Sequence, residues 1–120
     1  MPLEFTVTAK ESLAVVILKG AFDDSAEGVL AECLGSLKEK NAKAVVLHMA
    51  EVSDFSKEGY RAFTVFSRGL KESGIYQRLA AVNEVIKENL VKLGLIGFGE
   101  AKDTLPEALA DAIAVIRAKA

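Results

Sequence analysis

Short apolar runs alternate with amphipathic segments along this chain, and that alternation most limits the folds open to it. Strict apolar–polar alternation is typical of a half-buried strand, and a short continuous apolar run is typical of a strand covered on both faces. These two patterns predict strands over residues 3–8, 13–18, 44–49, 75–82 and 95–98. Gly20 is expected to end the second of these strands.

Apolar residues spaced three and four apart predict a helix after each of the last four strands. These helices are expected over or around residues 26–40, 60–70, 85–93 and 105–116. Their N-termini should be capped by a box of Asp24 and Glu27, by Asn83, and by a box of Thr104 and Glu107. The last helix is expected to bury a regular stripe formed by Leu105, Leu109, Ala112, Ile113 and Ile116.

The resulting order of elements is ββαβαβαβα. It predicts an α/β fold with a mixed, mostly parallel central sheet of about five strands, on which about four helices pack. A chain of 120 residues, 51% of them hydrophobic, suits one compact domain over residues 1–120. Folds of this class host many activities, so the pattern alone names none of them.

Composition argues against several kinds of partner and site. The formal charge is -2 and no basic block appears, which argues against nucleic acid as a partner. The apolar runs fall far short of the roughly 20 residues that cross a bilayer, and no signal-peptide pattern is present, so we expect a cytoplasmic protein without direct membrane insertion. One His and one Cys, with Cys33 on the buried stripe of the first helix, argue against a metal site. No nucleotide-binding motif is complete, so no cofactor is expected.

Several stretches carry a resemblance to a known family. They are residues 16–23 (VILKGAFD), residues 44–47 with Val52, and residues 59–63 (GYRAF), followed later by residues 93–95 and 107–109. In this order and spacing they resemble the STAS family, the sulfate transporter and anti-sigma factor antagonist domain. The resemblance covers nearly the whole chain and implies a STAS-like domain that acts in bacterial regulation by binding proteins, without enzymatic activity.

The usual phosphorylation motif of that family is where this chain differs. In the family, the helix after the third strand opens with Asp-Ser-Ser/Thr-Gly, and an anti-sigma kinase typically phosphorylates the first serine to release the complex. Aligned without a gap, the tetrad falls on Ser56, Lys57, Glu58 and Gly59, and only the glycine matches. Lys57 stands at the acceptor position and cannot carry a phosphoester, and His48 replaces the usual strand aspartate. We therefore expect the usual serine switch to be absent, and we keep Ser56 as the candidate phosphorylation site.

The resemblance also implies where a protein partner would bind. The expected contact residues lie in the loop and first helical turn after the third strand and in a neighbouring loop: Asp23, Phe55, Ser56, Lys57, Glu58 and Gly59. The family pairing suggests an anti-sigma factor kinase as the partner. The alternatives are an accessory role in a transport ATPase or a stress-signalling assembly, and sensing of a small anion or nucleotide at a helix N-terminus. The sequence leaves the oligomeric state open.

Several of these residues also have a purely structural interpretation. Ser56 suits an N-cap, which would contribute about 1 kcal/mol. Lys57 and Glu58 suit a solvated first turn, where exposed charges contribute little. Phe55 suits either a core contact or a partner hot spot, with the core favoured.

A catalytic interpretation has weaker support. Ser56, His48 and Asp54 supply the residue types of a hydrolase triad, but no nucleophile-elbow motif accompanies them. His48 is instead expected to be a hydrogen-bonded histidine within a strand.

Overall fold

Five strands and four helices make up the part of the chain that the computed structural model describes, residues 2–97 and 99–119. The strands are β1 (Glu4–Lys10), β2 (Leu13–Phe22), β3 (Ala44–Phe55), β4 (Tyr76–Ala80) and β5 (Ala101–Lys102). The helices are α1 (Ala26–Glu39), α2 (Lys57–Glu72), α3 (Glu84–Lys92) and α4 (Leu105–Lys119). The predicted order ββαβαβαβα is confirmed.

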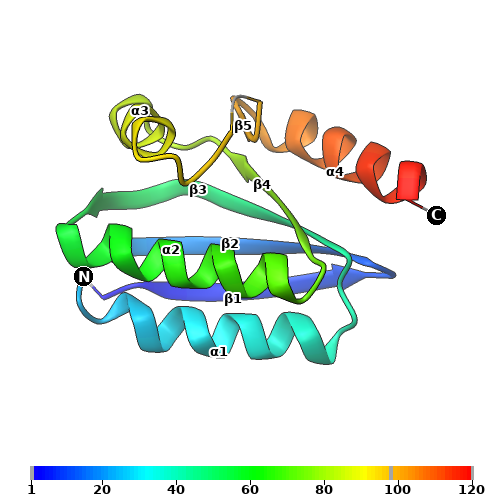
Figure 1. Cartoon of the computed structure of the whole chain (residues 1–120), viewed down its shortest axis with the longest axis horizontal. Coiled ribbons are helices and arrows are strands. Elements are labelled where there is room, and N and C mark those ends of the chain that lie inside the picture. The colour runs from blue at the N-terminus through cyan, green and yellow to red at the C-terminus, as the bar shows by residue number, and fades with distance from the viewer. Residues whose placement is uncertain (1, 98, 120) are drawn as a thin grey trace.

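The strands form one sheet in the order β1-β2-β3-β4-β5. β1 runs antiparallel to β2, and every other pair of neighbours is parallel. α1 and α2 lie side by side on one face of the sheet, and α4 lies on the opposite face (Figure 1). The predicted α/β fold with a mixed, mostly parallel sheet is therefore confirmed. Within the described residues, no helix has the length and apolarity needed to cross a bilayer.

The two faces of the sheet carry cores of different size. The larger core joins the sheet to α1, α2 and α3 and holds the bulky fully buried side chains, such as Phe22, Phe63 and Leu37. Cys33 lies in this core with no exposed surface, and burial raises the pKa of its thiol to about 12. The smaller core, between α4 and the β3–β4 pair, is built largely from alanine: Ala44, Val46, Ala80, Ala108 and Ala112.

β2 and β3 extend further than their apolar runs predicted. Gly20 does not end β2: it lies inside the strand with φ of 107°, next to a shift in the β2–β3 register. A left-handed φ of this kind favours glycine, which explains why this residue stands at the irregularity. Both strands continue until Phe22 pairs with Phe55, so β2 and β3 terminate together at the same end of the sheet.

The predicted strand over residues 95–98 is wrong over its described part. Residues 95–97 form a loop, and the strand that pairs with β4 comes later, at Ala101–Lys102. The Glu100 carboxylate accepts a hydrogen bond from the Gly97 N–H (3.0 Å), and Gly99 has φ of 88°, so the chain turns here. Ile96 is buried in this loop, which shows that the apolar run fills the core without forming a strand. The fourth residue of the predicted strand lies outside the described residues.

Two predictions about the helices also need correction. The box of Asp24 and Glu27 does not form, because α1 begins after Ser25 and has no side-chain cap. Ile113 is 39% exposed and lies off the buried stripe of α4. The other caps are confirmed: the Asn83 carboxamide accepts from the Val85 N–H (2.8 Å), and the Thr104 hydroxyl accepts from the Glu107 N–H (3.3 Å).

Candidate partner-binding site

Ser56 joins β3 to α2 and is held by hydrogen bonds of its backbone and its side chain. Its backbone N–H donates to the Phe22 carbonyl oxygen (2.9 Å), and its hydroxyl donates to the same oxygen (3.3 Å). The hydroxyl also accepts from the Gly59 N–H (3.2 Å), which is the N-cap bond of α2. The predicted cap is confirmed, and the hydroxyl is used as donor and as acceptor at once.

Gly59 allows the first turn of α2 to rest directly on the end of β2. A Cβ atom at this position would lie 1.9 Å from the Phe22 carbonyl oxygen, far inside any permitted contact. Gly59 is itself buried. Its place in the junction is therefore steric: it lets Ser56 and the helix N-terminus sit against β2.

An aromatic cluster supports the junction from below. The Phe55 ring stacks on the Phe22 ring, with centroids 4.1 Å apart and planes 9° from parallel. The Tyr60 ring centroid lies 4.8 Å from that of Phe55, with the rings tilted, and the Phe63 ring lies 6.1 Å away, edge-on to Phe55. Phe55 is half-buried and packs against the larger core.

Two exposed charged side chains lie at the start of α2. Lys57 and Glu58 are the first two residues of α2, and neither has an ion-pair partner among the described residues. The backbone N–H groups at a helix start carry partial positive charge, so a cation in the first turn is unfavourable there. The position of Lys57 therefore does not help to stabilise α2.

Asp23 follows Phe22 directly, so its loop adjoins the junction that the Phe22 carbonyl holds. Its carboxylate accepts hydrogen bonds from the Ser25 hydroxyl (2.6 Å) and the Ser25 N–H (2.9 Å). These two bonds, the hydroxyl first, lower the pKa of Asp23 below its usual value. The structure thus brings Asp23 and residues 54–59 to the same end of the sheet.

Sequence reasoning missed two contacts that fix this site. One is the Phe22 carbonyl, a backbone group that no side-chain motif reveals. The other is a hydrogen bond from the Asn89 carboxamide to the Tyr60 hydroxyl (3.0 Å), which ties α3 to the first turn of α2. The hydroxyl of a half-buried tyrosine needs a hydrogen-bond partner. Tyr60 in the apolar stripe of the predicted helix was therefore a usable hint.

The structure does not assemble a hydrolase triad. His48 lies in mid-strand opposite Ile17 and Ala80, eight residues before Ser56, a separation of roughly 26 Å along an extended chain. The Ser56 hydroxyl is bonded to Phe22 and Gly59 and not to His48. His48 lies within β3, as predicted, and no hydrogen bond joins its ring to another described residue. No cluster of three metal-binding side chains occurs among the residues that the structure describes.

Comparisons with known proteins agree with this fold. A family model described as the STAS domain matches residues 4–108. No curated protein matches the chain in sequence. Among solved structures, a sulfate transporter family protein from Wolinella succinogenes is 20% identical with a TM-score of 0.79, over 92% of each chain.

Two further structures are similar. RsbS from Moorella thermoacetica, in a serine-to-glutamate variant, is 18% identical with a TM-score of 0.78, over 94% of this chain and 97% of that one. The STAS domain of a SulP transporter from Vibrio cholerae is 24% identical with a TM-score of 0.76, over 92% of this chain and 88% of that one. At these identities the structures establish the fold, and the family model covers most of the sequence. The chain belongs to the STAS domain family.

Proposed function

We propose that this protein is a non-enzymatic regulatory module that resembles an anti-sigma factor antagonist and binds a protein partner through its β3–α2 junction, residues 54–59. The proposal depends on one observation above all. The junction presents Lys57 and Glu58, exposed and unpaired among the described residues, on a base fixed by Ser56, Gly59 and Phe55. Because these contacts already fix the junction, less entropy is lost when Lys57 and Glu58 are ordered against a partner.

We further propose that the usual serine switch is absent. Lys57, at the position of the family's acceptor serine, has no hydroxyl. A phosphate on Ser56 would remove the hydroxyl proton that Phe22 accepts and the oxygen geometry that caps α2 at Gly59. It would also place nearly two negative charges against a carbonyl oxygen. Binding would then be constitutive or controlled by another signal.

The charge of Lys57 supports a binding role. This cation is unfavourable at the N-terminus of α2 and has no ion-pair partner among the described residues. The Lys57 ammonium group is therefore available to an anionic group on a partner. An ATP-binding anti-sigma kinase is the partner that we favour. A transport ATPase or a stress-signalling assembly remains an alternative, which the identity of the bound protein would decide.

Affinity capture from a lysate of the source organism tests the site. The tagged wild-type chain is compared with Lys57→Glu and with Lys71→Glu, which makes the same charge reversal in the last turn of α2, about 21 Å away along the helix. We expect a partner that binds the wild type and the Lys71 variant but not the Lys57 variant. Circular dichroism must show all three chains folded. A partner that binds all three equally would place the contact elsewhere.

The same captured partner tests the switch. The purified pair is incubated with ATP and magnesium, and the intact mass of the chain is then measured. We expect no mass increase of one phosphate. A phosphopeptide carrying modified Ser56 would contradict the proposal, and Ser56→Ala would confirm the position by abolishing it.

A further inference from the structure

β1 is an edge strand whose outer side has no strand beside it in the described structure. It has one neighbour, β2, and all seven residues pair with β2 in an unbroken register from Glu4 to Lys10. Backbone N–H and C=O groups of alternate residues therefore point away from the sheet along its free edge. Such an edge is a template for pairing with another strand.

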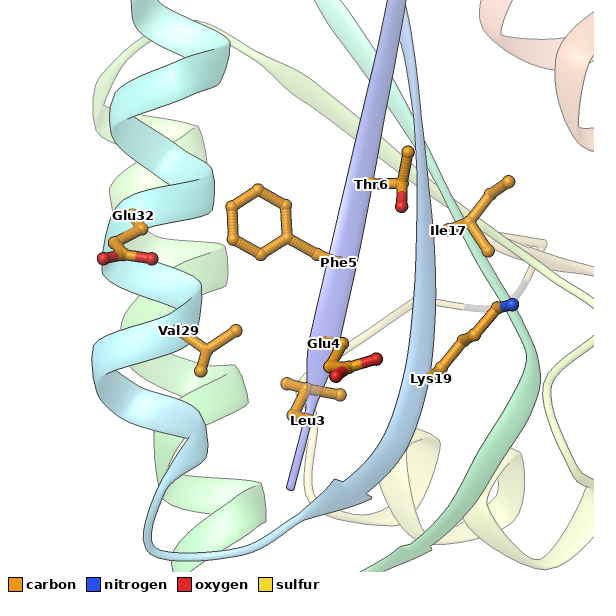
Figure 2. Close-up of a pocket in the computed structure, with 8 residues that line it drawn as sticks. All are labelled: Leu3, Glu4, Phe5, Thr6, Ile17, Lys19, Val29 and Glu32. Atoms are coloured by element: carbon orange, nitrogen blue, oxygen red, sulfur yellow. The ribbon is translucent and has the colours of Figure 1, made fainter. Parts of the chain in front are cut away.

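Natural sheets usually block this kind of edge, and β1 lacks several of the usual devices. Within Glu4–Lys10 there is no proline and no register shift against β2. Figure 2 shows Phe5 turned toward α1, while Thr6 lies on the opposite side of β1 with Ile17 and Lys19. No charge points inward: Phe5 and Val7 pack on the larger core. The strand also borders a hollow of about 410 Å³ that reaches Val29 of α1.

The sequence of β1, EFTVTAK, is chemically self-complementary about its central residue. In an antiparallel pair with a two-fold axis at Val7, Glu4 of one copy faces Lys10 of the other, and Thr6 faces Thr8. On the α1 side of the sheet, the large Phe5 faces the small Ala9, and Val7 faces itself. We propose that β1 pairs with β1 of a second copy of this chain in this register.

The charges select this register over its neighbours. Neither Glu4 nor Lys10 has an ion-pair partner among the described residues. Moving the axis by one residue would place each of them opposite threonine or beyond the end of β1. Opposite charges, threonine pairs and β-branched residues directly across an antiparallel pair are all favourable contacts. Each unlike pair occurs twice because a two-fold interface is isologous.

Such a dimer would join two five-stranded sheets into one continuous sheet. The axis reverses the strand direction between the copies. The two β3–α2 junctions, which lie at the ends of β2 and β3, would therefore face opposite ways. This inference does not depend on what those junctions bind.

Cysteine cross-linking tests the register. Residues directly opposite in an antiparallel pair have Cα atoms roughly 4.5–5.5 Å apart, within disulfide range, so Val7→Cys should form a covalent dimer on mild oxidation. Ala9→Cys is the matched control: it lies on the same face of β1, but its copies would be roughly 14 Å apart. Cys33 is buried with its thiol pKa raised to about 12, so it does not compete. No dimer from Val7→Cys, or equal dimer from both variants, would overturn the register.

A charge exchange tests the dimer without a new thiol. Sedimentation of the wild type should show the mass rising from 12.8 kDa toward twice that value with concentration. Glu4→Lys and Lys10→Glu alone should each weaken the dimer about tenfold, because two like-charged pairs replace two opposite ones. The double variant Glu4→Lys/Lys10→Glu should recover most of that loss. A wild type that stays monomeric up to about 1 mM, or a double variant no tighter than either single one, overturns the proposal.

Discussion

At Gly59 the absence of a side chain lets α2 pack closely against the sheet. The Phe22 carbonyl oxygen occupies the place where a Cβ would stand, at 1.9 Å. This residue is the one match to the family's tetrad, and the structure gives it a packing reason. The same carbonyl accepts both donors of Ser56, so one backbone atom organises the whole junction.

Gly59→Ala should therefore destabilise the protein, although glycine-to-alanine changes inside helices usually stabilise. We expect a loss of about 1–3 kcal/mol in the free energy of unfolding, as for an overpacked site. Gly28→Ala is the matched control, because a Cβ there meets nothing within 4 Å, and it should gain about 0.5–1 kcal/mol. Urea unfolding measures both. Effects of the same sign would show that α2 can shift away from β2 freely.

Ser56→Ala removes the cap of α2 and one of the two bonds to Phe22. We expect the free energy of unfolding to fall by about 1–2 kcal/mol. Ser53→Ala, at an exposed position of β3 whose side chain makes no hydrogen bond in the described chain, should change it by less than about 0.5 kcal/mol. Equal effects in urea unfolding would contradict the role of the hydroxyl as a cap.

At the scale of elements, the sequence predicted the types and the order of the helices and strands well. It predicted the positions of their ends poorly. Periodicity identified all four helices because each buries one stripe, as α2 does with Phe63 and Phe66. It misplaced β5 because a buried loop can be as apolar as a strand, which Ile96 shows. It stopped β2 at Gly20 because a glycine inside a bulge looks like one that ends a strand.

The site was predictable in part for a related reason. Ser56 could be recognised as a cap because capping is local in sequence. The stacking of Phe55 on Phe22 could not, since it depends on two register shifts between β2 and β3 that align their ends. A pairing between strands 33 residues apart has no local signature.

The charges at the two ends of α2 should have opposite effects on stability. Lys57 stands in the first turn and Lys71 in the last. Because the helix start carries partial positive charge, Lys57→Gln should stabilise by about 0.3–1 kcal/mol, and Lys71→Gln should destabilise by a similar amount. Thermal unfolding at low salt measures the pair, and the difference should shrink at about 1 M salt. Two shifts of equal sign would exclude the dipole as the cause.

At the scale of the whole molecule, the two faces of the sheet are unequally held. α1 and α2 bury large side chains, whereas the fully buried residues of α4 are Ala108 and Ala112. Free energy from burial grows with apolar area, so α4 gains less than the helices on the other face. An ion pair from Arg78 of β4 to Asp111 of α4 adds to its attachment.

This asymmetry predicts that α4 opens before the sheet does. In native-state hydrogen exchange, amides of residues 107–118 should be protected at least about tenfold less than those of β2 and β3, because opening α4 exposes less apolar surface than opening the larger core. Arg78→Ala should lower protection further in α4 while leaving β2 unchanged. Lys19→Ala, which removes the ion pair to Glu51 on the sheet, is the matched control and should leave α4 as it was. If α4 exchanged at the same rate as β2 in every variant, the small core would be opening only together with the large one, as a single cooperative unit.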